Sequence, residues 1–308
     1  MKRLPSIHLL VVAVLAVFAA LAFFAPVQVA ETLFTLDRKL SGLERKELVL
    51  PGGERIVYLE GGKGEPLLLL HGFRGNKDHF TRAARFLGGH YRIIAPDLLG
   101  FGESDHPTGA DYTPAGQARR MHAFLRQLGV DGAHLGGSSM GGQIALHYAA
   151  LYPDQTRSLW LLAPNGVPGA EPGELARTMA AGGPNVLMAS NEEEFGRLFE
   201  VVMADPPFMP GFVRNVIARE PLRYQALHQR IFADVNGSPA PGEAKAPALV
   251  VWGAQDRVLH VSGAAALGRL LPRAQVIVMP GVGHLPMLER DREVAEDYLA
   301  FRRRLAGR

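Results

Sequence analysis

The sequence predicts an α/β protein: a mostly parallel, doubly wound sheet with an inserted helical cap and an apolar N-terminal segment. Three observations predict this class. Short apolar runs alternate with longer helical stretches, which is typical of strand–helix–strand units. The alternation stops once, between residues 165 and 245. The chain has 308 residues, 47% apolar and 20% charged, which indicates a folded globular protein and excludes disorder and long coiled coil.

Cysteine and charge exclude several classes of protein. The chain contains no Cys, which rules out disulfide frameworks, cysteine nucleophiles and Cys-ligated zinc or iron–sulfur centres. The net charge is +3, and Lys2 and Arg3 account for two of these charges. The rest of the chain shows no basic and aromatic interleaving of the kind that binds phosphate backbones. We therefore expect no nucleic-acid partner.

Residues 9–25 carry no charge, and basic residues stand only on their N-terminal side. This run is long enough to span a bilayer, so residues 1–30 are predicted to be a signal anchor that leaves the rest of the chain outside the cytoplasm. A cleaved signal peptide is the first alternative, because Ala20 and Ala22 form a small-x-small pattern, and cleavage would give a secreted protein. A buried core helix is the second alternative.

The predicted strands begin with 46–50 and 55–60, which flank the turn Pro51-Gly52-Gly53 and so indicate a hairpin. The following runs are short and almost continuously apolar, which is typical of parallel strands covered on both faces. They are residues 66–70, 91–95, 133–135, 158–162, 248–252 and 275–279.

The predicted helices lie between these strands, at residues 79–87, 115–128, 140–152, 262–271 and 290–305. Residues 165–245 are instead rich in Phe, Met and Pro, and we interpret them as a helical cap over the carboxyl edge of the sheet, where open α/β sheets bind ligands. The predicted organisation is a segment 1–30, a core in two parts, 31–164 and 246–308, and the cap 165–245.

Gly137-Ser138-Ser139-Met140-Gly141 matches the G-x-S-x-G pattern between a predicted strand and a predicted helix. In that position the pattern predicts a sharp turn that exposes the hydroxyl of Ser139 as a nucleophile. The glycines are needed because the helix passes close to the strand. A serine hydroxyl needs a base, so a His and a carboxylate must follow, in the order serine, acid, histidine.

Asp256 follows the strand 248–252, and His284 follows the strand 275–279. Both side chains are therefore expected beside Ser139, with His284 as the base and Asp256 as the group that orients it. Asp234 in the cap is a competing acid, and Asp256 could instead cap a helix. His260 is expected to lie in a surface loop.

The oxyanion formed by such a nucleophile needs donors. We predict the backbone N–H groups of Met140, just after the nucleophile, and of Phe73, in the loop after strand 66–70. His71 is expected to support that loop, and Asp97 to organise its own turn. No group of residues shows metal-ligand spacing, and Gly100-Phe101-Gly102 is too short for a dinucleotide motif, so no metal and no cofactor are predicted.

HGFRGNKDHF, PDLLGFGESD, GGSSMGGQIALHYAALYP, WGAQDRVL and GVGHLPMLERD occur in the order found in the α/β-hydrolase superfamily, which the chain resembles over residues 48–305. KDHF, SSMGGQ, LLAPNGV and NEEEFGRLFEVVMADPPFMP are similar to membrane-anchored monoacylglycerol lipases and related bacterial lipases and esterases. One departure is His134, where the elbow strand usually carries an apolar residue.

This resemblance implies a serine hydrolase with Ser139, Asp256 and His284 as the triad and Phe73 and Met140 as oxyanion donors. It implies ester hydrolysis of lipid-like substrates with short to medium acyl chains, such as monoacylglycerols. No obligate protein partner is evident, and the membrane is contacted through the N-terminal segment. The apolar cap side chains suit an acyl chain, with ordinary packing as the alternative: Phe195, Phe199, Met203, Phe208 and Met209.

Two other functions stay open. A carbon–carbon bond hydrolase of ring-cleavage products uses the same triad, and a catalytically silent binding protein can share the fold. Dehalogenases and epoxide hydrolases are disfavoured, because they carry Asp at the position of Ser139.

Overall fold

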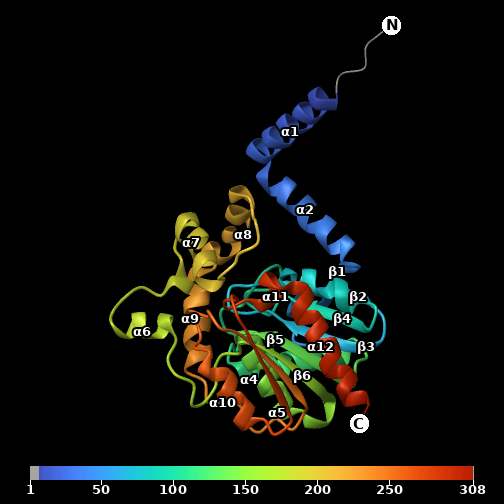
Figure 1. Ribbon diagram of the computed structural model, residues 1–308, viewed down its shortest axis with the longest axis vertical. Coiled ribbons are helices and arrows are strands. Elements are labelled where there is room, and N and C mark those ends of the chain that lie inside the picture. Colours follow the sequence, from blue (N-terminus) through green and yellow to red (C-terminus); the bar gives the residue numbers. More distant parts are fainter. Residues whose placement is uncertain (1–6, 308) are drawn as a thin grey trace.

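The computed structural model describes residues 7–307 as an eight-stranded sheet with helices on both faces (Figure 1). Lys2 and Arg3 lie outside the described residues. The strand order is β1-β2-β4-β3-β5-β6-β7-β8, and all pairs from β4 to β8 are parallel. The predicted mostly parallel sheet is therefore confirmed. The strands are β1 (Leu43–Val49), β2 (Arg55–Gly62), β3 (Glu65–Leu70), β4 (Tyr91–Pro96), β5 (Ala133–Ser138), β6 (Thr156–Leu162), β7 (Ala248–Gly253) and β8 (Ala274–Met279).

The predicted hairpin is also confirmed, because β1 and β2 pair antiparallel from Leu43 opposite Gly61 to Val49 opposite Arg55. β2 in turn pairs antiparallel with β4, so the hairpin extends one end of the parallel sheet.

Helices cover both faces of the inner strands and explain their apolar runs. The expectation is wrong for the edge strand β8, where Val276 and Val278 are 38% and 45% exposed. Leu68 and Leu70 of β3 pack with the core that includes α4 (Pro114–Gln127), α5 (Met140–Leu151) and α10 (Ser262–Leu270). The alternate residues Leu67 and Leu69 pack on the opposite side with α3 (Thr81–Leu87) and α12 (Asp291–Ala306). Successive side chains on a strand point to opposite faces, so a sheet buried on both faces needs apolar residues at nearly every position. Three short helices lie in the connections: η1 (Lys77–Phe80), η2 (Pro153–Gln155) and α11 (Pro286–Glu289).

β5 extends to Ser138, three residues past the predicted end. Glycine is a poor strand former, so Gly136 and Gly137 concealed the last part of the strand. The sheet requires a small residue there, because a Cβ on Gly136 would lie 2.6 Å from Leu69 Cδ2. His134 is fully buried in this strand, between β3 and β6.

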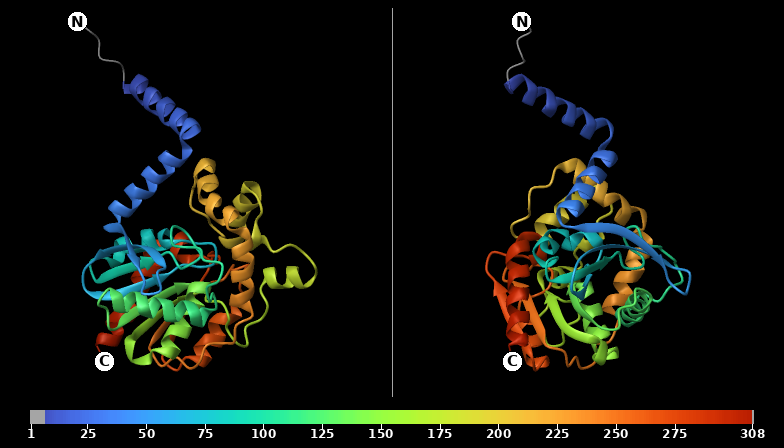
Figure 2. Two further views of the ribbon diagram at one scale, coloured as in Figure 1. Left: turned by 180° about the vertical axis from the view of Figure 1, so that it is seen from behind. Right: turned by 90° about the vertical axis from the view of Figure 1, so that its right-hand side faces the viewer.

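The cap segment, residues 165–245, lies between β6 and β7 and contains α6 (Glu174–Ala180), η3 (Val186–Met188), α7 (Glu192–Val202), α8 (Gly211–Arg223) and α9 (Gln225–Asn236). These helices stand together on one side of the sheet (Figure 2). Ala189, Phe195 and Ala218 form a small apolar core within the cap. Part of the cap is therefore held together by its own packing.

The N-terminal residues form α1 (Ile7–Phe24) and α2 (Pro26–Leu40). α1 projects away from the sheet, and its Phe23 and Phe24 are 78% and 82% exposed (Figures 1 and 2). The alternative of a buried core helix is therefore wrong. Among the described residues no single helix qualifies as a membrane span; the two helices qualify only as a pair, which bends by 114°. The signal anchor stays a prediction.

α2 was not predicted, and the expected boundary at residue 30 falls inside it. Proline suits the first turn of a helix and basic residues suit the last, and this helix has Pro26 at its start and Arg38 in its last turn. Arg38 donates two hydrogen bonds to Asp78, at 2.6 and 2.7 Å, which fasten α2 to the loop after β3.

Candidate active site

Ser139 lies in the turn between β5 and α5, with φ 53° and ψ −118°. L-residues rarely adopt a left-handed φ, and such strain persists only where the surroundings enforce it. A Cβ on Gly137 would lie 2.3 Å from Gly141 O, and one on Gly141 would lie 2.2 Å from Leu70 O. The strand and helix therefore approach too closely for any other residue at these two positions, which is the geometry that the G-x-S-x-G pattern predicts.

The structure brings Asp256 and His284 together from the loops after β7 and β8. His284 Nδ1 lies 2.8 Å from Asp256 Oδ2, and both side chains are buried. The second carboxylate oxygen of Asp256 accepts the N–H groups of Val258 and Leu259 at 2.8 and 2.9 Å. Asp234, the competing acid, instead pairs with a cap arginine on α9. Its carboxylate takes no part in this arrangement.

Ser139 and His284 line one cavity of about 80 Å³ beneath the cap. Among the described residues no hydrogen bond joins these two side chains, and such contacts are often long before substrate is bound. The cap holds the histidine loop, because the N–H of His284 donates to Val202 O at the end of α7, at 2.8 Å. Glu289 strengthens this contact by accepting the N–H groups of Gly283 and Ala204, each at 2.8 to 2.9 Å.

The predicted oxyanion donors border the nucleophile. Phe73, Met140 and Ser139 line a second cavity, and a Cβ on Gly72 would lie 3.3 Å from the Ser139 Cβ. Among the turns, loops and helix caps of residues 7–307, neither the N–H of Phe73 nor that of Met140 donates a backbone hydrogen bond. Phe73 and Met140 therefore border the same cavity as Ser139, and their N–H groups stay the predicted oxyanion donors.

Two buried polar side chains support the Phe73 loop, of which His71 was expected to do so and Asp97 was expected only to organise its own turn. The Nε2 atom of His71 accepts the N–H of Leu98 at 3.0 Å, so its Nδ1–H donates to Gly72 O at 2.8 Å. Burial lowers the pKa of His71 to about 4, which keeps the ring neutral in this role. Asp97 accepts the backbone N–H groups of Lys77 and Glu103, at 2.6 and 2.8 Å, and so organises this loop as well as its own turn.

The second cavity has a volume of about 310 Å³ and reaches Ser139 from the side of α9. Sequence reasoning singled out Phe73, Ser139 and Met140 but missed the rest of its lining, which comes from residues 165–187, 232–236 and 258–259. Phe232 and Asn236 stand one helical turn apart on α9, a spacing that could have indicated a common face. The cavity is also lined by Asn165, Leu175, Ala176, Met179, Leu187, Val235, Val258 and Leu259.

The predicted acyl-binding residues divide into two groups. Phe195 and Phe199 line the cavity that contains Ser139 and His284. Phe199 also lines an outer cavity of about 320 Å³ near α2, together with Met203, Phe208 and Met209. Phe208 is 90% exposed. A direct role beside the nucleophile therefore stays a prediction for Phe195 and Phe199, whereas the other three lie farther out.

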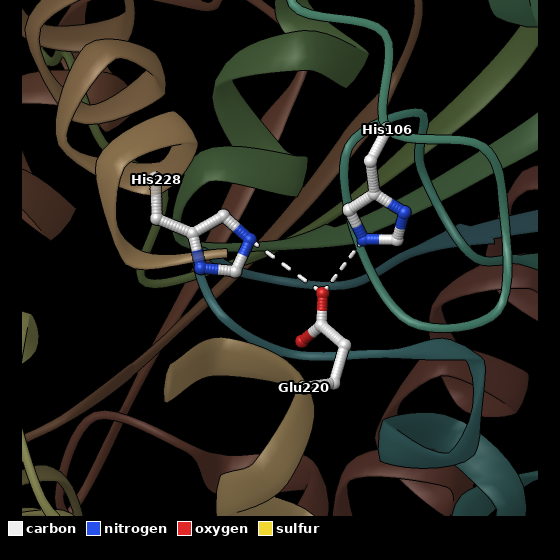
Figure 3. Close-up of side chains that lie close together, drawn as sticks. All are labelled: His106, Glu220 and His228. Atoms are coloured by element: carbon white, nitrogen blue, oxygen red, sulfur yellow. Dashed lines mark hydrogen bonds and ion pairs between the residues drawn. The ribbon is translucent and has the colours of Figure 1, made fainter. Parts of the chain in front are cut away.

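His106, Glu220 and His228 form a cluster that the sequence did not suggest (Figure 3). Two imidazoles and a carboxylate are a zinc ligand set, but both ring nitrogens of His228 already have partners. Its Nε2–H donates to Gly100 O at 3.0 Å, and its Nδ1 accepts from Arg74 Nε at 3.4 Å. Metal binding would break one of these hydrogen bonds, so the cluster fits better as a contact between cap and core. His260, outside this cluster, bonds Ser262 through Nδ1.

Comparisons with known proteins agree with this fold. Residues 65–291 match the sequence profile of the alpha/beta hydrolase fold. Lipase 1 of Psychrobacter immobilis is 41% identical over 286 residues, which cover 90% of this chain and 89% of that protein. The monoacylglycerol lipase ABHD6 of Homo sapiens is 27% identical over 257 residues, covering 78% of this chain and 76% of that protein.

A solved structure extends the similarity to almost the whole chain. The crystal structure of a membrane phospholipase A, described as a bacterial virulence factor, has 38% sequence identity and a TM-score of 0.86. The alignment covers 98% of each chain. The similarity therefore includes the N-terminal region as well as the sheet and the cap.

Proposed function

Because the chain belongs to the α/β hydrolase fold family, we propose that it cleaves carboxylic esters through a covalent intermediate on Ser139. The observation that carries this proposal is the strained Ser139 turn, which opens into an apolar cavity beside the His284–Asp256 pair. The lipase relatives of the chain support the coarser class, an ester hydrolase. The geometry of the site supports Ser139, His284 and Asp256 as the residues that carry out the reaction.

In the proposed acylation step, His284 Nε2 removes the proton of Ser139 as Oγ forms a bond to the ester carbonyl carbon. The carbonyl oxygen becomes an oxyanion, which the N–H groups of Phe73 and Met140 stabilise. His284 then gives its proton to the leaving alcohol as the ester bond breaks. Water releases the acyl group by the same steps, and the serine is regenerated.

Asp256 keeps His284 in the tautomer with its proton on Nδ1, so Nε2 is free to act as the base. The carboxylate stabilises the imidazolium that forms during each step. Its own position is fixed by Val258 and Leu259, so the acid cannot turn away from the ring.

We infer a substrate with one short to medium acyl chain. A cavity of about 310 Å³ is small for a ligand site and its lining is largely apolar. Burial of each methylene contributes about 0.8 kcal/mol, so catalytic efficiency rises with chain length until the cavity is filled. The name of the relative ABHD6 points to monoacylglycerols, and that of the solved relative points to phospholipids. We propose the former as the better fit to a cavity of this size.

We further propose that residues 1–30 anchor the protein to a membrane with the catalytic domain outside the cytoplasm. The exposed apolar side chains of α1 support this proposal. The full-length protein should then stay with membranes in carbonate. A mature N-terminus at Phe23, found by mass spectrometry, would instead establish cleavage and secretion.

The test of function combines covalent labelling with a substrate series. A fluorophosphonate should label the wild type and not Ser139→Ala, which also excludes a silent binding protein. On esters of graded length, kcat/KM should rise, peak at medium chains and fall for long ones, with 1-monoacylglycerols preferred over triacylglycerols. Activity confined to a ring-cleavage dienoate would favour the carbon–carbon bond hydrolase, and a flat response would show that the cavity does not bind the chain.

A further inference from the structure

Arg74 directly follows the proposed oxyanion donor Phe73 and is almost fully buried, with 6% of its surface exposed. Its backbone φ of 56° lies in the left-handed region, which L-residues seldom occupy. Arginine is seldom buried unless its donors are satisfied, so both the backbone and the side chain of Arg74 must be held by their surroundings.

The side chain donates four hydrogen bonds, and every acceptor belongs to the cap. Nη1 donates to Leu187 O and Ala189 O at 2.9 and 3.0 Å, and Nη2 donates to Pro221 O at 2.7 Å. Nε donates to His228 Nδ1 at 3.4 Å. One guanidinium group therefore joins η3, α8 and α9 to the loop that contains Phe73.

The acceptors of the Arg74 side chain are three backbone carbonyls and a ring nitrogen, and they can stabilise a buried cation without a carboxylate. Leu187 O and Pro221 O belong to the last turns of η3 and α8, where carbonyl groups have no partner within the helix and carry partial negative charge. Burial lowers the pKa of Arg74 to about 10, so the group stays charged at neutral pH. The planar fork of arginine can reach several carbonyls at once, which lysine cannot.

The side chain of Phe73 also packs against the cap. Its ring packs against Phe232 and His228 of α9, with centroids 5.4 and 6.0 Å apart. The other proposed donor, the N–H of Met140, belongs to the first residue of α5, so the backbone of that helix holds it. The two donors of the oxyanion hole therefore have different supports.

We propose that Arg74 is a positioning residue that fixes the Phe73 N–H toward the oxyanion by binding its loop to the cap. This inference rests on the proposed serine mechanism. The cap then contributes to the transition state as well as to the acyl site. Removal of one oxyanion donor costs about 10²- to 10³-fold in kcat, so its displacement should cost less, about 10- to 100-fold.

The experiment compares Arg74→Met and Arg74→Lys with Arg230→Met in the full-length protein. Arg230 also joins cap to core, by donating to Thr108 O and Ala110 O, but it lies away from the Phe73 loop. Three quantities are measured: kcat and KM on a soluble ester, the inhibition constant of a trifluoromethyl ketone, and the Kd of an unreactive ether of the same chain length. The ketone forms a hemiketal oxyanion on the serine, whereas the ether occupies the cavity without one.

We expect Arg74→Met to lower kcat and to raise the ketone inhibition constant by a similar factor, with KM and the ether Kd changed less than about threefold. Arg230→Met should leave all of them near wild type. If Arg74→Met does not fold, Arg74→Lys supports the same comparison, because it keeps the charge but loses the fork. Unchanged kcat, or ketone and ether binding weakened equally, would overturn the inference. Wild-type turnover that survives Ser139→Ala would instead overturn the proposed function.

Discussion

Two groups that each contain a serine, a histidine and a carboxylate lie at opposite edges of the same sheet. Ser139, His284 and Asp256 follow the carboxyl ends of β5, β8 and β7. The second group lies at the start of strands: Glu65 opens β3, and His134 and Ser158 lie near the start of β5 and β6. His134 Nδ1 lies 2.8 Å from Ser158 Oγ, and its Nε2 lies 3.0 Å from Glu65.

The difference between the two groups is access and local geometry. Ser158 is 0% exposed inside a strand, and its hydroxyl also meets Tyr298 at 3.2 Å. Ser139 stands on a left-handed turn beside a cavity that Phe73 and Met140, the proposed oxyanion donors, also line. A hydrogen-bonded serine, histidine and carboxylate therefore indicate catalysis only where a substrate carbonyl can reach the hydroxyl and an oxyanion can be stabilised. The group at the amino edge is a buried polar network.

The largest effect should separate the two serines. Ser139→Ala should lower kcat by about 10⁶-fold, because the covalent step is lost, and His284→Ala should cost nearly as much, with little added in the double variant. Ser158→Ala should keep activity within about twofold but lower the free energy of unfolding by about 1–3 kcal/mol, since buried partners lose a hydrogen bond. Ester hydrolysis measures kcat, and urea unfolding measures the free energy of unfolding. An active Ser139→Ala together with an inactive Ser158→Ala would reverse the assignment.

The carboxylates give a smaller contrast. Asp256→Asn should lower kcat by about 10⁴-fold, because the amide no longer holds the required tautomer of His284. Glu65→Gln should leave kcat unchanged and cost less than about 1 kcal/mol, since the Glu65 side chain is 49% exposed. Steady-state kinetics of the two purified variants tests the pair. Equal losses of activity would show that the comparison of the two edges is wrong.

The smallest expected effect is the contribution of His134 to the pH dependence of stability. Burial lowers the pKa of His134 to about 4, against 6.5 in the unfolded chain. Between these values the unfolded state binds more protons, so stability is complete above pH 6.5 and is lost as the pH falls toward 4. His134→Gln should therefore show a shallower loss of unfolding free energy between pH 7 and pH 5 than the wild type. His71, His79 and His228 act in the same direction and remain in both proteins, so a slope identical to wild type would contradict the prediction.

Local sequence was sufficient for most of the sheet and for the nucleophile turn. Apolar runs predict strands that are buried on both faces, as in β3, because every position must then be apolar. Gly137 and Gly141 predict the turn at Ser139, because the strand and the helix approach each other within a few positions of the chain, although Gly141 also lies against Leu70 of β3. The order of Ser139, Asp256 and His284 placed their side chains at one edge, because parallel strands end on the same side.

Contacts between the cap and the core were beyond this reasoning. Arg74 meets carbonyls 113 to 147 residues away, and His106, Glu220 and His228 meet from the core and the cap. No local pattern predicts such pairs, since they depend on how the cap packs on the sheet. Phe208 and Phe195 show the same limit: both are apolar residues of one segment, yet one is 90% and the other 3% exposed. Residue type and spacing set the elements and the reactive turn, whereas burial, cavity shape and the contacts of Arg74 exist only once separate elements have packed together.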